Sequence, residues 1–177
     1  MGIGIWAMHF IGMLAMNMSM NMRYEPVLTG LSMAIAIGSS LFALWLVSAP
    51  QLHLRRLIPG SVVMGLGIAA MHYTGMAALQ VSPPIVWHKG WIALSILIAL
   101  AASFAALWLT FRLRHEAAQV ALMRFGAAIL MGLAITGMHY TGMMAAQIPF
   151  QHHHIAMVHH GFNNNWLAVL VSMMAFS

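Results

Sequence analysis

Six apolar runs, separated by short polar or Pro/Gly-bearing breaks, constrain what this chain can fold into. Most of them approach the roughly 20 residues that a helix needs to cross a lipid bilayer. The runs cover about residues 2–20, 28–49, 60–80, 90–111, 125–148 and 165–177. Because 62% of the residues are hydrophobic and 5% are charged, with a mean hydropathy of +0.88, a soluble globular domain is excluded. The sequence therefore predicts an all-α, multi-pass transmembrane bundle of about six helices.

The charged residues indicate how these helices are oriented in the membrane. Arginines are concentrated in two of the breaks, at about residues 50–60 and 112–124. By the positive-inside rule, both breaks lie in the cytoplasm. The helices that start near residues 60 and 125 then run outward, and alternation makes the first helix run outward too. Since the seven Lys and Arg residues are scattered among loops, no nucleic-acid-binding surface is predicted.

Several classes of protein chemistry are absent from the sequence. There is no cysteine, which excludes disulfides, thiolate metal sites and a cysteine nucleophile. Glu25 and Glu116 are the only acidic residues and both fall in breaks, so we do not expect an enzyme. No charged segment with a cleavage site precedes the first run, so we expect no removable signal peptide. The first and last runs are short, and we expect residues 1–177 to be a fragment of a longer protein.

A histidine-bearing motif recurs three times inside the apolar runs. MHYTGM occupies residues 71–76 and 138–143, and a degenerate version, MHFIGM, occupies residues 8–13. All three copies fall in outward-running helices, which places the histidines in the outer half of the membrane. A polar ring in the hydrocarbon region is costly and by default marks a functional site.

Each motif segment is followed by a partner helix, and this pair is the repeating unit of the chain. The motif segments, which align without gaps, are residues 2–15, 65–78 and 132–145, and the partner segments are residues 31–46, 94–109 and 166–175. Because two helices return the chain to the same side, the units are parallel repeats about an axis along the membrane normal. The repeat predicts that the three motif helices meet around a pseudo-threefold axis.

Each motif histidine is followed, one helical turn later and on the same helix face, by a methionine. The pairs are His9 with Met13, His72 with Met76 and His139 with Met143. Imidazole nitrogen and thioether sulfur form a soft ligand set that suits copper, Cu(I) in particular. The methionines that precede the histidines point about 100° away on an ideal helix and are weaker candidate ligands; they are Met8, Met71 and Met138. The alternative is that the histidines are hydrogen-bonded core residues and the methionines fill gaps.

Small residues on the same helix face predict close helix packing beside the motifs. They are Gly65 with Ala69 in the second copy and Gly132 with Thr136 in the third. Small side chains let two helices approach closely in a membrane, where packing drives association. The first copy departs from this pattern because Trp6 stands in place of the second small residue.

Two segments near the predicted outer surface carry further candidate metal donors. The first is the end of the first run, with Met16, Met18, Met20 and Met22, and the second is a loop with His152, His153, His154, Met157, His159 and His160. Methionine-rich and histidine-rich tracts can bind metal, and histidines titrate near neutral pH. An ordinary methionine-rich helix end and a solvated loop explain the two segments equally simply.

With these three motifs and the repeated helix pairs, the chain resembles the MHYT family of bacterial integral-membrane sensor domains over nearly its whole length. The resemblance implies a location in the bacterial inner membrane and a copper ion held through Met and His residues on the outer side. It also implies detection of oxygen, carbon monoxide or nitric oxide. A cytoplasmic signalling domain, such as a cyclic-di-GMP enzyme or a histidine kinase, would be the partner. The first copy departs from the family motif at Phe10 and Ile11.

The function predicted on these grounds is a copper-dependent sensor of a diatomic gas or of redox state. One alternative is a haem-bearing electron carrier, in which two of the histidines ligate the iron axially. Another is copper transport, which would need donors through the whole thickness of the membrane.

Overall fold

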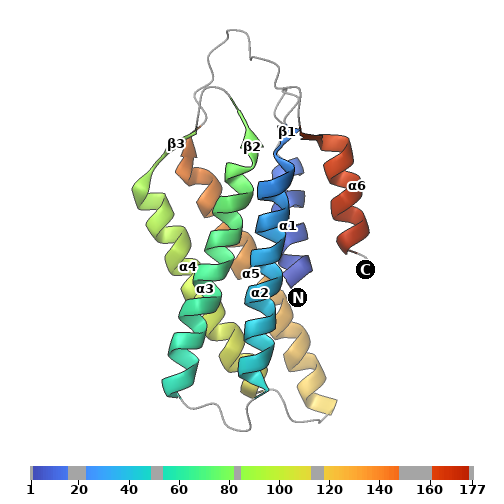
Figure 1. The fold of residues 1–177 in the computed structure, drawn as a ribbon. Helices are drawn as coiled ribbons and strands as arrows, with labels where there is room; N and C mark the ends of the chain where they lie inside the picture. Colours follow the sequence, from blue (N-terminus) through green and yellow to red (C-terminus); the bar gives the residue numbers. More distant parts are fainter. Residues whose placement is uncertain are drawn as a thin grey trace.

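The computed structural model describes residues 2–15, 23–48, 54–81, 85–112, 118–147 and 161–175. This part of the chain forms six helices that run side by side (Figure 1). They are α1 (Gly2–Ala15), α2 (Pro26–Val47), α3 (Leu54–Ala77), α4 (Lys89–Arg112), α5 (Ala118–Ala145) and α6 (Asn164–Ala175). The helices α2 to α5 are long and apolar enough to cross a membrane, whereas α1 and α6 are shorter. The prediction of an all-α transmembrane bundle is confirmed.

Short strands, which the sequence did not predict, join the helix ends on one side of the bundle. They are β1 (Arg23–Tyr24), β2 (Leu79–Gln80), β3 (Val86–Trp87), β4 (Ala146–Gln147) and β5 (Phe162–Asn163). The antiparallel partners of β1 are β2 and β5, and β3 pairs with β4. Helices α3 and α5 therefore end a few residues earlier than the apolar runs, because the last residues of each run turn into extended backbone.

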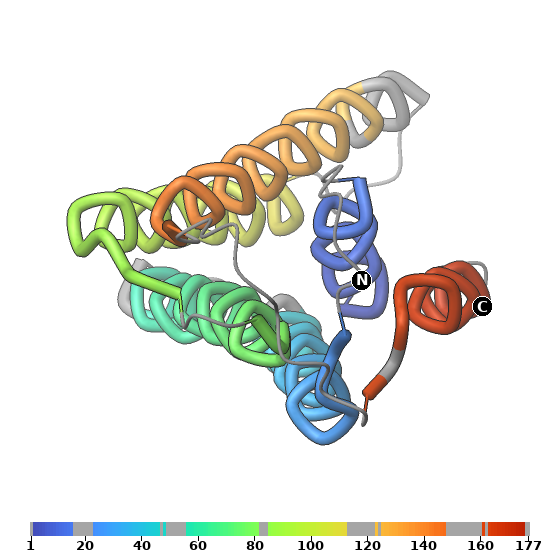
Figure 2. The backbone as a smooth tube through the Cα atoms, turned by 90° about the horizontal axis from the view of Figure 1, so that it is seen from above, coloured from blue at the N-terminus to red at the C-terminus, as the bar shows by residue number. Residues whose placement is uncertain are grey.

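The order of the helices around the bundle follows the repeat. Partner helix α2 packs against α1 and α3, partner helix α4 packs against α3 and α5, and α6 packs against α1. The motif helices α1, α3 and α5 contact one another at the centre. Figure 2 shows this arrangement from above, with α6 beside α1 and apart from α5. Each partner helix thus contacts the motif helix of the next unit, as expected for parallel repeats about one axis.

Glycines set how closely two of the motif helices approach their partners. A Cβ atom at Gly65 would lie 3.0 Å from the carbonyl oxygen of Ala99 on α4, so the prediction of close packing there is confirmed. Gly2 has the same contact with Ala36 on α2. The corresponding prediction for Gly132 is wrong, since nothing lies within 4 Å of a Cβ atom at that position. The reason is that α6, the partner of α5, covers α1 instead.

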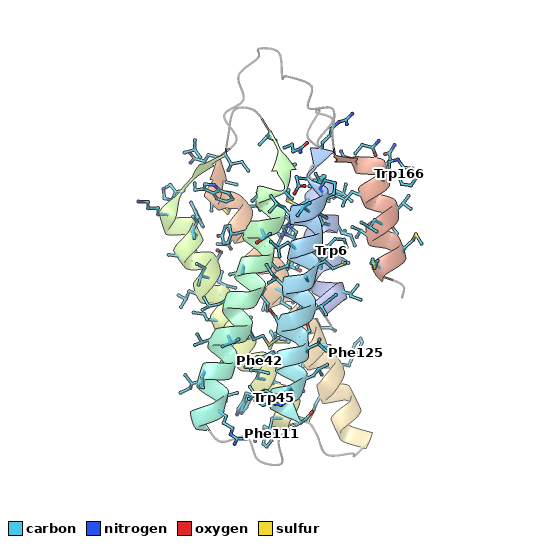
Figure 3. The ribbon with its side chains drawn as sticks, viewed as in Figure 1. Trp6, Phe42, Trp45, Phe111, Phe125 and Trp166 are labelled. Carbon is cyan, nitrogen blue, oxygen red and sulfur yellow. The ribbon has the colours of Figure 1, made fainter. Side chains whose placement is uncertain are left out.

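The two ends of the bundle differ in chemistry. Arg56 lies in the first turn of α3 and Arg112 ends α4, so both lie at the end of the bundle away from the motif histidines. Trp45 lies near the end of α2 at this same side of the bundle, and Figure 3 shows it low on the molecule with Trp166 at the opposite side. Glu25 caps the other end of α2, where its carboxylate accepts hydrogen bonds from the backbone N–H groups of the first turn. This acidic residue therefore has a structural role.

Candidate metal centre

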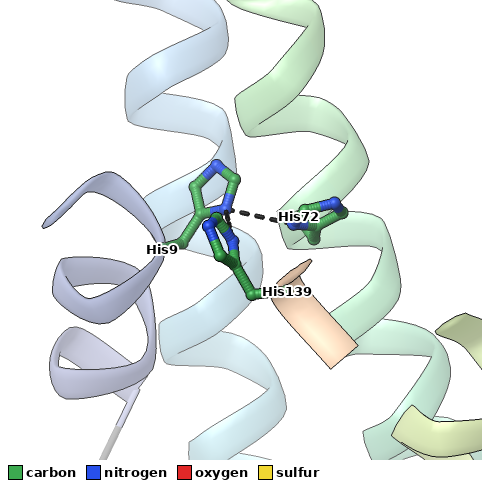
Figure 4. Close-up of side chains that lie close together, drawn as sticks. All are labelled: His9, His72 and His139. Carbon is green, nitrogen blue, oxygen red and sulfur yellow. Dashed lines mark hydrogen bonds between the residues drawn. The ribbon is translucent and has the colours of Figure 1, made fainter. Parts of the chain in front are cut away.

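The three motif histidines, one from each motif helix, meet at the centre of the bundle (Figure 4). His9, His72 and His139 are each at most 1% exposed. The Nδ1 atom of His9 lies 3.1 Å from the Nδ1 atoms of both His72 and His139. The rings stand nearly perpendicular to one another, with centroids 4.9–5.3 Å apart. The predicted meeting of the three motifs is confirmed.

Hydrogen bonds among the three rings cannot satisfy this cluster completely. A neutral imidazole carries one N–H, so the Nδ1 atom of His9 either donates to one neighbour or offers a single lone pair to two. Three lone pairs directed at one metal ion would use all three Nδ1 atoms together. Metal–nitrogen bonds of about 2.0–2.1 Å place three such ligands about 3.3–3.6 Å apart. The two separations that involve His9 are 3.1 Å, close to this spacing, and one ring nitrogen of each histidine lies within 4.8 Å of the others, so the residues fit a small metal ion.

The outer nitrogen of each ring faces a glycine from another copy of the motif. The pairs are His9 with Gly75, His72 with Gly142, and His139 with Gly12. In each pair a Cβ atom on the glycine would overlap the Nε2 side of the imidazole ring. All three Nε2 atoms are buried and have no hydrogen-bond partner among the described residues. The glycines therefore form sockets that turn the Nδ1 atoms inward, and the three pairs link the motif helices in a closed cycle.

These glycines were missed by sequence reasoning, although a signal was available. Each copy of the motif has glycine three positions after the histidine, including the degenerate copy at residues 8–13. A glycine inside a helix costs about 0.5–1 kcal/mol relative to alanine, so its recurrence at one position indicates a close approach. The sequence could not show that the approaching group is the histidine of a different copy.

A serine on the partner helix holds the motif helix in the first two units. Trp6 donates a hydrogen bond from Nε1 to Oγ of Ser32, at 3.0 Å. The hydroxyl of Tyr73 lies 2.6 Å from Oγ of Ser95, which is the equivalent serine in the second unit. Trp6 thus replaces the tyrosine hydroxyl that the first copy lacks, because Phe10 occupies the tyrosine position.

Aromatic rings close the side of the cluster next to His9. Phe10 packs edge-on against His9, at 4.8 Å between centroids, and Tyr24 of β1 packs edge-on against Phe10, at 5.8 Å. Tyr24 is fully buried and its hydroxyl has no partner among the described residues. Burial raises the pKa of Tyr24 to about 12, so the side chain stays neutral and adds no charge near the site.

The candidate methionine ligands are mostly buried near the histidine layer. Met13, Met71, Met76 and Met138 are at most 1% exposed, whereas Met8 and Met143 are half-buried. Core methionines are buried in the same way, so ligation by these sulfur atoms stays a prediction. The other candidate donors, at residues 16–22 and 152–160, lie outside the described residues.

Comparisons with known proteins agree with the repeat. A family profile described as "Bacterial signalling protein N terminal repeat", MHYT, matches residues 2–60 and 65–123. Each match begins in a motif helix and continues through its partner helix. The third motif, at residues 138–143, follows the second match.

Three relatives are bacterial signalling proteins. The "Bifunctional diguanylate cyclase/cyclic di-GMP phosphodiesterase MucR" of Pseudomonas aeruginosa is 54% identical over 177 residues, which is 100% of this chain and 26% of that protein. The "Signaling protein YkoW" of Bacillus subtilis is 41% identical over 148 residues, or 82% of this chain and 18% of that protein. The "Cyclic di-GMP phosphodiesterase NbdA" of Pseudomonas aeruginosa is 40% identical over 146 residues, or 82% of this chain and 19% of that protein.

The chain therefore spans only 18–26% of the length of each of these relatives, and no solved structure matches it. The family follows from two profile matches that together cover more than half of the chain, and from a membrane bundle built from the same repeat. The chain belongs to the MHYT family, whose members are sensor modules of bacterial signalling proteins.

Proposed function

We propose that this chain senses a diatomic gas, such as oxygen, carbon monoxide or nitric oxide, or redox state, through a copper ion held by His9, His72 and His139. The observation that carries the proposal is the convergence of three buried Nδ1 atoms from three different helices. Burying three imidazoles against one another is costly unless their polar atoms acquire a shared partner. A soft or borderline metal ion is such a partner, and the motif methionines favour copper.

Bound copper would supply an open coordination position and a one-electron redox change, because three protein ligands leave room for a further one. The chain itself supplies the coupling. Each histidine belongs to one motif helix and rests on a glycine of another, so a shift of one ring moves two helices relative to each other. Since α3 and α5 continue well beyond the histidine layer, such a shift would reach the far ends of both helices.

The partner that reads this shift is proposed from the relatives. MucR and NbdA are named as cyclic-di-GMP enzymes, and this chain matches only a part of each. We infer that the chain controls a cyclic-di-GMP enzyme on the cytoplasmic side of a bacterial inner membrane. Arg56 and Arg112 would face that side, and the histidines would lie in the outer half of the membrane.

The spacing of the rings argues against the haem alternative. An axial haem pair holds its two nitrogen atoms on opposite faces of a porphyrin, at about 4 Å from each other, when each bond is about 2 Å. In this chain the nitrogen atoms lie 3.1 Å apart and a third ring fills the remaining side. This spacing favours a single small ion over a porphyrin placed between His9 and either of the other two rings.

The first test is metal retention by the purified chain. The wild type, the double variant His72→Ala with His139→Ala, and the control His88→Ala would be purified in detergent, and their metal content would be measured by mass spectrometry. His88 is exposed and lies outside the cluster, so its replacement should leave copper binding intact. Stoichiometric copper in the wild type and the control, and none in the double variant, is the expected result.

The second test separates sensing from metal storage. The copper-loaded wild type would be exposed to carbon monoxide, and infrared spectra would be compared with those of the double variant. A carbon monoxide band found only in the wild type would support the sensor. Full copper retention by the double variant, or a haem absorption band in the wild type, would overturn the proposal.

A further inference from the structure

A groove lies at the end of the bundle opposite the histidines. It occupies about 570 Å³ between the last turns of α2 and the first turns of α3. Its apolar walls include Phe42, Leu46 and Val63, and its rim includes Trp45 and Arg56. Trp45 is 71% exposed and Val63 is 49% exposed, so the groove opens onto the outer surface of the bundle. In a membrane-spanning bundle that surface faces lipid.

In the second unit an arginine of the same helix covers the matching tryptophan. Trp108 is the counterpart of Trp45, and the guanidinium of Arg112 lies over its ring at 5.1 Å from the centroid. The position of the first unit that corresponds to Arg112 is Ala49, which carries no charge. The ring of Trp45 instead packs at 5.9 Å from Phe42 and keeps most of its surface exposed. The first unit therefore has no arginine at the position from which the second unit covers its tryptophan.

The charge of this end selects the kind of ligand. Arg56 is exposed and makes no ion pair among the described residues. The one acidic side chain that the structure describes, Glu25, caps the opposite end of α2. Arg56 also lies in the first turn of α3, where the helix dipole favours an anion. A tryptophan beside an arginine at a helix end is typical of the level of lipid headgroups.

We propose that this groove binds an anionic phospholipid, with the phosphate on Arg56 and one acyl chain along Phe42, Leu46 and Val63. An arginine forms strong charge-assisted hydrogen bonds with phosphate oxygens. Basic pockets between helix ends are a known way for membrane proteins to select anionic headgroups. The site depends neither on the metal nor on the sensing proposal.

The test places the full chain in nanodiscs and uses phosphatidylglycerol as the probe. Native mass spectrometry would count retained phosphatidylglycerol and phosphatidylcholine, and quenching of Trp45 by brominated phosphatidylglycerol would locate the lipid. Arg56→Gln should weaken phosphatidylglycerol binding about tenfold, as expected on loss of one hydrogen bond between charged groups. Arg112→Gln is the matched control, because it removes the same charge at the same end from a side chain that covers Trp108.

A second pair of variants tests the apolar part of the groove. Val63→Phe should fill the groove and lower retention of the lipid, whereas Val62→Phe, at a neighbouring exposed valine that does not line the groove, should not. Equal losses for Arg56→Gln and Arg112→Gln would overturn the proposal, since the effect would then be general charge attraction. Unchanged retention in Val63→Phe, or complete displacement of the lipid by inorganic phosphate, would overturn it as well.

Discussion

The first two helix pairs and the third hold their motif helices differently. In the first two, a glycine at the start of the aligned segment packs against an alanine carbonyl of the partner helix, as Gly2 does with Ala36 and Gly65 with Ala99. In the third, Gly132 has open space around it, because α6 packs against α1 and not against α5. The backbone contact that closes two of the pairs is therefore missing from the third.

The polar contacts follow the same division. Trp6 and Tyr73 reach equivalent serines on their partner helices. Tyr140, the counterpart of Tyr73, is 52% exposed, and its hydroxyl has no hydrogen-bond partner in the part of the chain that the structure describes. When Trp91 and Trp166 are aligned, Leu170 stands where the second unit has Ser95.

The histidine layer does not share this division. All three histidines are buried to the same extent, and each faces the glycine of another copy. The common requirement of the repeat is therefore the interlock of histidine and glycine, while the support behind each motif helix varies. Because α5 lacks the contact with its own partner helix that α1 and α3 have, we expect it to move most when the histidine layer changes.

The largest effects should come from the histidine layer itself. Replacing any one of His9, His72 and His139 with alanine removes one of three ligands, so each single variant should lose copper affinity by more than about 100-fold, beyond the loss typical of outer-shell groups. Competition with a chelator of known affinity measures this loss. Copper affinity that falls for two of the variants and is unchanged for the third would contradict the equivalence of the three copies.

The glycine sockets should come next. In Gly75→Ala the new methyl group would push the ring of His9, and overpacking of this kind costs about 1–3 kcal/mol. Both the free energy of unfolding and the copper content should fall. Gly137→Ala, on α5 with nothing within 4 Å of the new methyl group, is the control and should leave copper content unchanged.

The cross-copy pairing can be tested without metal. Gly75→Ala combined with His9→Ala should cost much less than the sum of the two single variants, because the ring that the methyl group displaces is gone. Thermal unfolding of the metal-free protein measures the coupling. Additive costs would show that the socket does not act through His9.

Replacing the glycine that faces the partner helix should change stability in opposite directions in the second and third units. Gly65→Ala should destabilise the chain by about 1–3 kcal/mol, because the methyl group would lie 2.9 Å from Cα of Leu100. Gly132→Ala should instead stabilise it by about 0.5–1 kcal/mol, the usual gain of alanine over glycine inside a helix. Unfolding in a detergent series compares the two, and a loss of stability in both would contradict the open third pair.

The sequence predicted the parts of this fold that depend on local pattern and repetition. Apolar runs gave six helices, and the recurrence of one motif at equal positions in three units required the histidines to share one level. The sockets could not be predicted, because Gly75 acts on His9, a residue of another unit. The packing of α6 against α1 likewise depends on contacts between helices that are distant in the sequence.

The departures of the first copy show both the strength and the limit of reading one motif at a time. In the sequence, Trp6 is an exception to the small-residue pattern and Phe10 is an exception to the tyrosine pattern. The structure shows that the two exceptions compensate, since the indole of Trp6 takes over the hydrogen bond to the partner serine. Only the packing of α1 against α2 reveals that Trp6 compensates for the hydroxyl that Phe10 lacks.

The smallest predicted effects test this compensation. Trp6→Phe and Tyr73→Phe each remove one hydrogen bond to a serine, and interhelical hydrogen bonds in membrane proteins contribute about 0.6 kcal/mol on average. Tyr140→Phe removes a hydroxyl that is exposed and should change stability by less than about 0.3 kcal/mol, within the usual range for surface substitutions. In a Ser32→Ala background the cost of Trp6→Phe should fall by the share of the hydrogen bond, and the remaining cost measures the lost bulk of the buried indole. Unfolding of the wild type, the four single variants and the double variant Ser32→Ala with Trp6→Phe in one detergent is the measurement. A loss in Tyr140→Phe as large as in Tyr73→Phe would mean that the third pair is held as the second is, and the comparison of the three units would fail.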